Sequence, residues 1–576
     1  MRSDQRLKDS NREKRIYAYR TMAALLFVLV LTSGLAYRLY SLQIVNHQHF
    51  QTLSDKNRMQ LQSISPNRGL IYDRNGRLLA DNQPVFSVAI TPENTKSIDQ
   101  SLSDIAAIID ISPDQHKRFR KQLKRTRRPF QPVIVKSKLT EQEIAMIEVR
   151  RHELRGVKVL AELARHYPFF GDTAHSIGYV GRINEKELSK VDEQNYSATN
   201  YIGKLGVERF YEEQLHGSVG FQTIETNASN RVLRVLDRTD PIPGRDLTLY
   251  MDAQLQHKAV ELLGDHRGAV VAIEPKTGGI LALVSMPSFD PNAFVTGIDF
   301  KSYGALRDSL DLPLFNRALR GQYPPGSTIK PIIGLGGLDV GKYQLKNDER
   351  IYRDWKRQGH GRIDLASAIA QSCDIYFYDL AFKMGVDQMS KYLGHFGFGQ
   401  NTALDVSQAR VGILPTRAWK RGLKGRAWYP GDSLNLGIGQ GFMLATPLQL
   451  AAATAMLANR GEWVSPVYLK SASLPNDKLS VDIKHRQVNV PNLELGSKDD
   501  MDFIVQAMAE VMHGRHGTAR GSARKSKYRM AGKTGTAQRA AADGSGYDPD
   551  ASIASFAGFL PAEDPQYVCV VMVENP

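Results

Sequence analysis

The segment YPPGSTIKPII, Tyr323 to Ile333, places a serine and a lysine three residues apart, directly after two prolines and a glycine. The prolines and the glycine end an irregular segment, and the apolar residues that follow predict a helix with Ser327 as its N-cap. Residues three apart share one helical face, so Ser327 and Lys330 are expected to point the same way. A desolvated lysine can take the proton of a serine hydroxyl and make it a nucleophile. A capping serine followed by a surface lysine explains this segment alone equally well.

Two later segments, QSCDIYFYDLA and AGKTGTAQ, supply the other residue types that such a nucleophile needs. The first predicts the head of a helix, and the second predicts an edge strand. The order serine-x-x-lysine, serine-x-asparagine and lysine-threonine-glycine is the signature of penicillin-binding proteins and class A β-lactamases. The candidate residues are Ser327, Lys330 and Ser372 for catalysis, and Asp374, Lys533, Thr534, Gly535 and Thr536 for substrate binding.

These residue types divide the work of acyl transfer between them. Ser327 attacks a carbonyl and becomes an acyl-ester, while Lys330 takes and returns the proton. Ser372 can relay a proton to the leaving amine. The lysine and threonine of AGKTGTAQ offer a charge and a hydroxyl to a substrate carboxylate, and its glycine lets the substrate lie close to the strand. Backbone N–H groups of Ser327 and Thr536 can form an oxyanion hole.

An uncharged run from Thr21 to Tyr37 predicts that the chain is anchored in a membrane. The run is short for a membrane span, but Arg20 and Arg38 can reach the interfaces. The first 20 residues carry seven Arg or Lys against three acids, which keeps this tail in the cytoplasm and sends the rest outside. A cleaved signal peptide is the alternative, but no small-x-small cleavage site follows the run. We therefore expect an uncleaved single-pass anchor with an external body.

The formal net charge of +15 raises the question of nucleic acid. The sequence contains no Cys/His finger spacing, no RRM-type aromatic motif and no long lysine tract. The positive charge is spread over the N-terminal tail, residues 117–128 and residues 513–529. A basic surface that meets an anionic membrane or polymer fits this better than nucleic-acid readout. The two cysteines, Cys373 and Cys569, cannot provide a disulfide framework.

Hydrophobic patterning predicts an α+β fold. GAVVAIEPKTGGILALVSMP, residues 268–287, predicts a buried hairpin, and mainly helical patterns follow from Leu335 to about Met512. The segments MAGKTGTAQ, SIASFAGFL and QYVCVVMVENP then predict strands again. An antiparallel sheet with strands from both ends of a domain and helices between them is α+β. Earlier in the chain, RGLIYDRNGRLLA predicts a hairpin, and residues from about 100 to 160 read as helical and charged.

The chain resembles the class B penicillin-binding proteins along nearly its whole length, and within them the elongation-specific subgroup. RGLIYDRNGRLLA and GKLGVERFYEEQLHG resemble the pedestal domain of this family, and PPGSTIKP, LGIGQGFMLATPLQLA and AGKTGTAQ resemble its catalytic domain. The resemblance implies a cytoplasmic tail at 1–20, an anchor at 21–40, a pedestal domain of the dimerisation type at 41–265, and a transpeptidase domain of the serine β-lactamase type at 266–576.

The activity implied by this resemblance is that of a serine-type peptidoglycan DD-transpeptidase and penicillin target. Such an enzyme sits in the bacterial inner membrane, faces the periplasm and cross-links stem peptides through D-Ala-D-Ala during elongation and rod-shape maintenance. A D-Ala-D-Ala carboxypeptidase side reaction is implied when water replaces the acceptor amine. The implied partners are a polytopic glycosyltransferase of the RodA type at the anchor and an activator of the MreC type at the pedestal.

Two features depart from the family pattern. The second motif is Ser-Cys-Asp, and an ionised Asp374 cannot donate a hydrogen bond to a substrate amide. Aspartate at this position is nevertheless frequent in the elongation-specific subgroup. The sequence also ends directly after a strand, where relatives continue into a helix that covers the sheet, so we expect the domain to be truncated there.

A metal site is suggested by four residues around the second motif, namely Asp339, Asp354, His360 and Cys373. Carboxylate, imidazole and thiolate in fourfold coordination suit zinc. Scattered residues of these types, with a small buried cysteine beside the active-site serine, explain the pattern equally well. The resemblance implies one structural zinc ion in some elongation-specific members, whereas the acyl chemistry itself needs no cofactor.

Three other functions compete with that of an elongation-type transpeptidase. The first is a division-type transpeptidase of the same class. The second is a β-lactam sensor or hydrolase, but no motif clearly supplies a carboxylate that would activate a deacylating water. The third is a non-enzymatic membrane scaffold, against which the intact Ser327, Lys330 and Lys533 argue.

Overall fold

The protein is described here by a computed structural model that covers residues 10–45, 59–125, 132–226, 232–295, 297–339, 354–356, 358–406, 408–474, 480–481, 497–540 and 547–576. Helix α1 (Ser10–Tyr40) continues into the π-helical turn η1 (Ser41–Val45). Residues 14–45 are long and apolar enough to cross a membrane, and none of the apolar window is buried in the protein. This confirms the prediction of one N-terminal apolar helix. Residues 46–58, which follow the anchor, lie outside the described residues.

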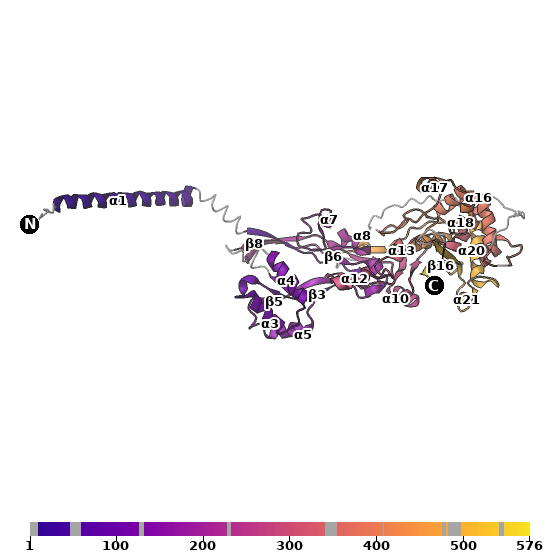
Figure 1. The fold of residues 1–576 in the computed structure, drawn as a ribbon, viewed down its shortest axis with the longest axis horizontal. Coiled ribbons are helices and arrows are strands. Elements are labelled where there is room, and N and C mark those ends of the chain that lie inside the picture. Colours follow the sequence, from indigo (N-terminus) through magenta and orange to yellow (C-terminus); the bar gives the residue numbers. More distant parts are fainter. Residues whose placement is uncertain are drawn as a thin grey trace, which may run out of the picture.

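The N-terminal half of the body contains a three-stranded sheet, most of a seven-stranded sheet and a two-stranded one, flanked by short helices (Figure 1). Its strands are β1 (Met59–Ile64), β2 (Ile71–Tyr72), β3 (Leu78–Ile90), β4 (Val133–Ser137), β5 (Val157–His166), β6 (Val180–Arg182), β7 (Tyr201–Gly203), β8 (Gly220–Thr226), β9 (Val232–Thr239) and β10 (Asp246–Leu249). Its helices and 3₁₀ turns are η2 (Pro92–Asn94), α3 (Ile98–Ala106), α4 (Pro113–Arg125), α5 (Glu141–Val149), η3 (Phe170–Asp172), α6 (Ala174–Ile177), α7 (Glu185–Leu188), α8 (Gly206–Phe210), α9 (Glu212–His216) and α10 (Ala253–Leu263).

The hairpin predicted from RGLIYDRNGRLLA is present. Strands β2 and β3 pair antiparallel, and Asp73 Oδ1 accepts the backbone N–H groups of Asn75 and Arg77 at 2.8 Å each. Gly76 closes the turn with a φ of +84°, which glycine adopts without strain. The helical prediction for residues 100–160 was only partly right, because β4 and β5 interrupt the helices and pair with β3. The Ala, Glu, Leu and Arg of β5 favour helices locally, and pairing with the long β3 overrides that preference.

The two halves of the chain share the seven-stranded sheet. Its order is β14-β13-β10-β2-β3-β4, with β5 also pairing with β3. Strand β13 (Leu469–Ser473) comes from the C-terminal half and lies antiparallel to β10. The hydroxyl of Tyr211, after α8, also donates to Asp405 Oδ2 in the C-terminal half at 2.8 Å, in a buried contact. Backbone pairing and a buried hydrogen bond therefore cross the predicted boundary near residue 265.

The C-terminal half is built on an antiparallel five-stranded sheet of order β12-β11-β17-β16-β15, so β15 is an edge strand as predicted. The remaining strands are β11 (Gly268–Ile273), β12 (Ile280–Met286), β14 (Ser480–Val481), β15 (Ala531–Ala540), β16 (Tyr547–Leu560) and β17 (Tyr567–Glu574). The helices and the 3₁₀ turn are α11 (Asn292–Val295), α12 (Phe300–Arg307), α13 (Arg317–Arg320), η4 (Gly326–Ile329), α14 (Lys330–Asp339), α15 (Leu365–Gln371), α16 (Asp374–His395), α17 (Arg417–Lys424), α18 (Pro430–Gly437), α19 (Pro447–Ala458), α20 (Lys498–His513) and α21 (Arg520–Ala523).

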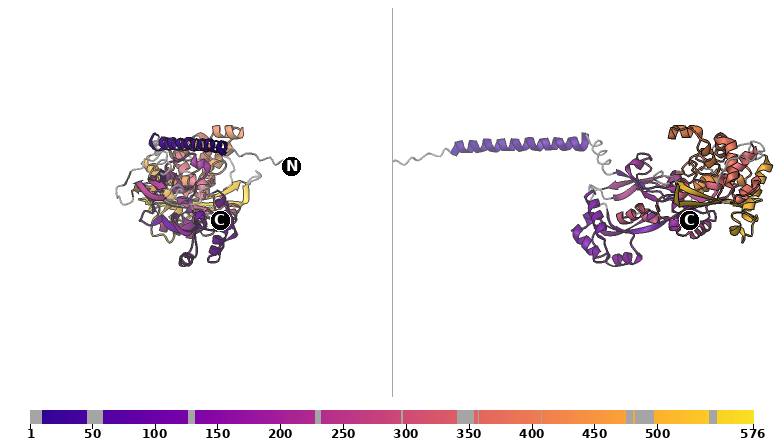
Figure 2. Two further views of the ribbon diagram at one scale, coloured as in Figure 1. Left: turned by 90° about the vertical axis from the view of Figure 1, so that its left-hand side faces the viewer. Right: turned by 45° about the vertical axis from the view of Figure 1, so that its right-hand side comes forward.

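Helices cover both faces of this sheet, which confirms the α+β prediction (Figure 2). Helix α19 packs on β11, β16 and β17, while α10 packs on β12. All twelve residues of α19 are buried, and Thr446 and Gln449 close its N-terminus with a capping box. The hairpin β11–β12 is almost entirely buried, as its two apolar runs predicted. The core of this half thus lies between α19 and the central strands, and α20 packs on β15, the strand that carries AGKTGTAQ.

Candidate functional site

Ser327 lies in the short 3₁₀ turn η4, which leads directly into α14. Its predicted role as a helix N-cap was wrong, because Pro325 occupies that position and no side chain caps η4. Thr328 Oγ1 instead donates to the carbonyl of Pro325 at 2.6 Å. The Ser327 side chain is half-buried, whereas Lys330, one helical turn later, is completely buried.

Two glycines allow η4 to lie against its neighbours. Gly326 has a φ of +58°, and its N–H donates to the carbonyl of Gly439 at 2.9 Å. A Cβ on Gly439 would stand 2.1 Å from Gly326 O, and one on Gly326 would stand 3.0 Å from Thr536 O. Only glycine therefore permits this approach. The backbone of Thr536 is consequently next to the turn that holds Ser327.

The Lys330 ammonium group is the centre of a buried hydrogen-bond network. Its Nζ donates to Ser372 O at 2.9 Å, to Ser372 Oγ at 3.3 Å and to Asp374 Oδ1 at 2.7 Å. The ring of Phe377 lies 5.3 Å from the same nitrogen. Burial lowers the pKa of Lys330, while the Asp374 carboxylate opposes that change. The arrangement therefore holds a lysine that gives up its proton more readily than a solvated one.

Ser372 joins α15 to α16 in a left-handed conformation, with a φ of +57° that is uncommon outside glycine. This conformation brings both Ser372 and Asp374 to Lys330, since α16 begins at Asp374 as predicted. The Ser372 carbonyl also accepts a hydrogen bond from Trp355 Nε1 at 3.2 Å. Two donors from different segments thus hold this strained residue in place.

The third motif lies on the edge strand β15. Lys533 is completely buried, and its Nζ donates to the carbonyl of Thr534 at 2.9 Å. Burial, reinforced by the nearby Lys330 charge, lowers the pKa of Lys533 well below that of a solvated lysine. Gly535 is required by packing, because a Cβ there would stand 2.4 Å from Ser555 Oγ. The structure therefore brings Lys533 into electrostatic contact with Lys330, next to a strand edge that can receive a substrate.

Thr518 is a site residue that sequence reasoning missed. Its Oγ1 lies 2.7 Å from Thr534 Oγ1, a hydrogen bond in which either oxygen can be the donor. Its N–H donates to the carbonyl of Ala370, two residues before Ser372, at 3.3 Å. Thr518 follows α20 in a basic, glycine-containing segment with no motif of its own, so no pattern in the sequence singled it out.

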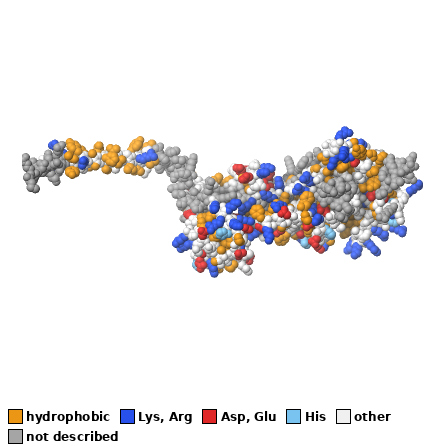
Figure 3. Space-filling model, in the orientation of Figure 1, with side chains coloured by type: hydrophobic (Ala, Val, Ile, Leu, Met, Phe, Trp, Pro, Cys, Tyr) orange, Lys and Arg blue, Asp and Glu red, His pale blue; other side chains and the backbone are white. Residues whose placement is uncertain are grey.

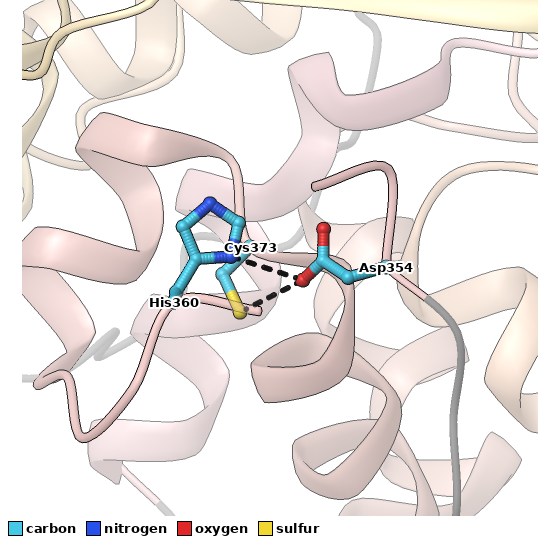
Figure 4. Close-up of side chains that lie close together, drawn as sticks. All are labelled: Asp354, His360 and Cys373. Atoms are coloured by element: carbon cyan, nitrogen blue, oxygen red, sulfur yellow. Dashed lines mark hydrogen bonds and ion pairs between the residues drawn. The ribbon is translucent and has the colours of Figure 1, made fainter. Parts of the chain in front are cut away.

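Asp354, His360 and Cys373 form a compact group beside the second motif (Figure 4). Asp354 Oδ2 lies 3.1 Å from His360 Nδ1 and 3.3 Å from Cys373 Sγ, and one ligand atom of each residue lies within 4.8 Å of the others. The side chains of Asp354 and His360 are each only 1% exposed. Among the described residues His360 Nε2 is buried without a hydrogen-bond partner. Carboxylate, imidazole and thiolate are donor types that zinc takes.

Asp339, predicted as a fourth ligand, is not part of this group. It is the exposed last residue of α14. The chain from 340 to 353, which leads from it to Asp354, lies outside the described residues.

Family models match both halves of the chain. Residues 268–576 match the penicillin binding protein transpeptidase domain, and residues 63–249 match the penicillin-binding protein dimerisation domain. Among curated proteins, the peptidoglycan D,D-transpeptidase MrdA of Acinetobacter baumannii is 42% identical over 589 residues, which cover 99% of this chain and 86% of that protein. MrdA of Escherichia coli is 38% identical over 554 residues, covering 93% and 87%.

Solved structures agree with these matches. Pseudomonas aeruginosa PBP2 in complex with WCK 5153 has a TM-score of 0.67 and 41% identity, over 90% of this chain and 92% of that one. PBP2 of Helicobacter pylori, solved in a complex with MreC, has a TM-score of 0.74 and 30% identity, over 90% and 95%.

Proposed function

Since this chain belongs to the class B penicillin-binding proteins and is an elongation-type peptidoglycan D,D-transpeptidase, we propose that Ser327 is the residue that carries the acyl group. The observation that carries this proposal is the buried Lys330, one turn after Ser327 and bound to Ser372 and Asp374. A serine one turn before a buried amine of lowered pKa suits nucleophilic catalysis, in which an adjacent base activates the hydroxyl.

In the first half-reaction, Ser327 Oγ attacks the carbonyl of the penultimate D-alanine of a donor stem peptide. The hydroxyl proton passes to neutral Lys330, and the carbonyl oxygen gains charge that the N–H groups of Ser327 and Thr536 stabilise. The C–N bond then breaks, and Ser372 passes a proton from Lys330 to the departing D-alanine amine. The product is an acyl-ester on Ser327 and one free D-alanine.

In the second half-reaction, an acceptor amine attacks the acyl-ester. It forms the cross-linking amide, releases the Ser327 hydroxyl and loses a proton to the same lysine. Lys533 and Thr534 bind the carboxylate of the donor during acylation. If water replaces the amine, the stem peptide is released uncross-linked, which is the proposed D-Ala-D-Ala carboxypeptidase side reaction. A β-lactam undergoes the same attack, but its opened ring stays attached.

We also propose the membrane arrangement that the sequence predicts. The basic tail of residues 1–20 stays in the cytoplasm, the anchor at 21–40 crosses the inner membrane, and the body lies in the periplasm. The body divides into a pedestal at 41–265 and a transpeptidase domain at 266–576. Support comes from the apolar helix at 14–45 and from the two family matches.

Two protein partners follow from the same family. The Helicobacter pylori relative was solved with MreC, so we propose that an MreC-type protein binds the pedestal of this chain. A RodA-type glycosyltransferase at the anchor is proposed on family resemblance alone.

Asp354, His360 and Cys373 are proposed to hold one zinc ion. Zinc there would supply a structural cross-link that fixes the segment leading into Ser372, and no step of acyl transfer. Burial, above all, raises the pKa of the Cys373 thiol to about 11, so zinc binding must release its proton. Elemental analysis tests the proposal, because Cys373→Ser should lose the metal and Cys569→Ser should keep it. A folded, metal-free wild type would contradict the proposal.

The activity is tested with the full chain and glycan strands that carry pentapeptide stems. Wild type should form cross-linked muropeptides, and folded Ser327→Ala should form none. A fluorescent penicillin distinguishes the alternatives, because a transpeptidase keeps the label, a hydrolase turns it over rapidly and a scaffold takes none. Cross-linking by Ser327→Ala would refute the assignment of the nucleophile.

A further inference from the structure

A strongly basic segment lies between α20 and the catalytic strand β15. Residues 513–530 contain no Asp or Glu. Five exposed basic side chains in this segment form a surface that we call the basic cap: Arg515, Arg520, Arg524, Lys525 and Lys527. Figure 3 shows Lys and Arg side chains gathered where α21 lies in Figure 1.

The basic cap has no paired acids in the described part of the chain. No ion pair joins any of its five side chains to an acidic group in the described part of the chain. Arg529, just outside the cap, shows the contrast, because it pairs with Glu563 at 2.9 Å and with Gln506 at 2.7 Å. Like charges held together without counter-charges repel one another, and an anion from outside the chain would relieve that repulsion.

The basic cap is attached to the catalytic site. Thr518, inside the cap segment, hydrogen-bonds Thr534 at 2.7 Å and the carbonyl of Ala370 at 3.3 Å. Met530, at its end, donates its N–H to His513 Nε2 at 2.9 Å and leads directly into β15. An anion bound on the cap is therefore held beside the strand edge that receives the stem peptide.

The position of the basic cap disfavours a lipid headgroup as its ligand. The chain enters the body from its anchor at β1, which pairs with β8, and these strands lie at one end of the elongated body. Helix α21 lies at the opposite end (Figure 1). A surface that is distal to the point of entry faces the wall and not the bilayer.

We propose that the basic cap binds the peptidoglycan strand through the free carboxylates of its stem peptides, an inference that rests on the proposed function. Stem peptides repeat along a glycan strand, so one strand presents several carboxylates at once. Arginine pairs with carboxylates in a planar, two-bond geometry, and lysine adds point charges. The basic cap retains the polymer beside Ser327 while individual peptides enter and leave the site.

Co-sedimentation of the full chain with purified sacculi tests this proposal. The cap variant replaces Arg515, Arg524, Lys525 and Lys527 with Gln and keeps Arg520, whose Nη1 donates to Arg515 O at 3.3 Å. A matched control removes four exposed charges from α4 in the pedestal by Lys117→Gln, Arg118→Gln, Lys121→Gln and Lys124→Gln. With each surface ion pair contributing roughly two- to threefold, the cap variant should bind sacculi about tenfold or more weakly at low salt.

The α4 variant should bind like wild type, and amidation of the sacculus carboxylates should abolish the difference between cap variant and wild type. A charge-preserving variant with Arg515→Lys, Arg524→Lys, Lys525→Arg and Lys527→Arg should keep binding, which controls for folding. Equal binding by wild type and the cap variant would overturn the proposal. An equal loss of sacculus binding in the α4 variant would overturn it too. So would a result in which phosphatidylglycerol vesicles compete with sacculi for the protein and muropeptides do not.

Penicillin acylation of the same samples keeps the two proposals apart. Ser327→Ala should bind sacculi like wild type and form no adduct. If wild type forms no penicillin adduct but the cap variant binds sacculi more weakly than wild type, the proposed nucleophile is wrong and the basic-cap proposal stands. If wild type is acylated normally and the cap variant binds sacculi as well as wild type, only the basic-cap proposal is wrong.

Discussion

Lys330 Nζ lies 2.7 Å from Asp374 Oδ1, so the residue that departs from the family asparagine is a direct partner of the buried lysine. An asparagine at this position would offer only a neutral amide oxygen. The negative charge of Asp374 acts against the larger effect of burial, which lowers the pKa of Lys330. Asp374 therefore raises the proton affinity of the proposed general base, in addition to any contact with the substrate.

Replacing Asp374 with Asn tests this relationship. The substitution removes a charge that raises the pKa of Lys330, so the pKa should fall further and neutral amine should form at lower pH. Under the proposed mechanism, acylation by a fluorescent penicillin needs neutral Lys330, so the rising limb of its pH–rate profile should move to lower pH. The pH dependence of the acylation rate constant, measured by stopped flow, reports this change.

The matched control is Asp379→Asn on the same helix, whose carboxylate pairs with Lys383 at 2.9 Å. Its profile should coincide with that of wild type. A limb that stays in place in Asp374→Asn, or moves to higher pH, would show that Asp374 does not tune Lys330.

Lys533→Met should stabilise the protein while it removes penicillin binding. Lys533 is completely buried, and its Nζ has a backbone carbonyl as hydrogen-bond acceptor. Replacing a buried charged group with an apolar chain of similar length can stabilise by about 1–4 kcal/mol. Stability lost for the sake of a functional site is expected in enzymes. Thermal unfolding and penicillin labelling of the same preparation measure the two effects.

The pH dependence of the unfolding free energy gives a second test of the effect of burying Lys533. The folded pKa of Lys533 lies below its ordinary value of 10.5, so between the two values the unfolded chain binds more protons. The unfolding free energy of wild type should therefore rise with pH in that window. Lys533→Met should lose the part of the rise that Lys533 contributes and keep the part from Lys330, whose pKa is also lowered. A variant that is less stable than wild type at neutral pH would contradict the prediction.

Thr518→Val should impair acylation without unfolding the protein. Its hydroxyl is exposed and hydrogen-bonds Thr534 at 2.7 Å. A neutral hydrogen bond contributes about 0.5–1.5 kcal/mol, so acylation should slow by roughly two- to tenfold. Thr518→Ser keeps the hydroxyl and should restore the wild-type rate. Equal rates for Thr518→Val and wild type would remove Thr518 from the site.

Trp355→Phe should loosen the strained Ser372. The substitution keeps an aromatic ring and removes the indole N–H that donates to Ser372 O at 3.2 Å. Lys330 still donates to the same carbonyl, so we expect a loss of several-fold in acylation and not its abolition. Penicillin labelling kinetics measure the loss. A rate equal to that of wild type would mean that Lys330 alone holds the left-handed conformation.

The sequence predicted those parts of the fold that depend on local patterns. The hairpin of β11 and β12, the NG turn after β2 and the edge position of β15 follow from apolar runs and turn residues. Strands β4 and β5 were missed because their register is set by β3, which no short window contains. The pairing of β13 with β10 joins residues more than 200 positions apart, and local pattern cannot indicate it.

In the candidate site too, short motifs predict some residues, and contacts between distant segments determine the others. Ser327, Lys330 and Lys533 are marked by short motifs, so sequence alone makes them candidates. Thr518 and Trp355 contact the site through hydrogen bonds that form only when distant segments meet. The capping role predicted for Ser327 failed because Pro325 precedes a 3₁₀ turn, a difference that the sequence pattern does not distinguish from an α-helical start.

Mass spectrometry of the intact full chain after a dose of β-lactam tests the nucleophile most directly. Wild type should gain the mass of one opened drug molecule, and fragmentation should place it on the peptide that contains Ser327. The folded Ser327→Ala protein should gain nothing. An adduct on another side chain, or none on well-folded wild type, would contradict the assignment.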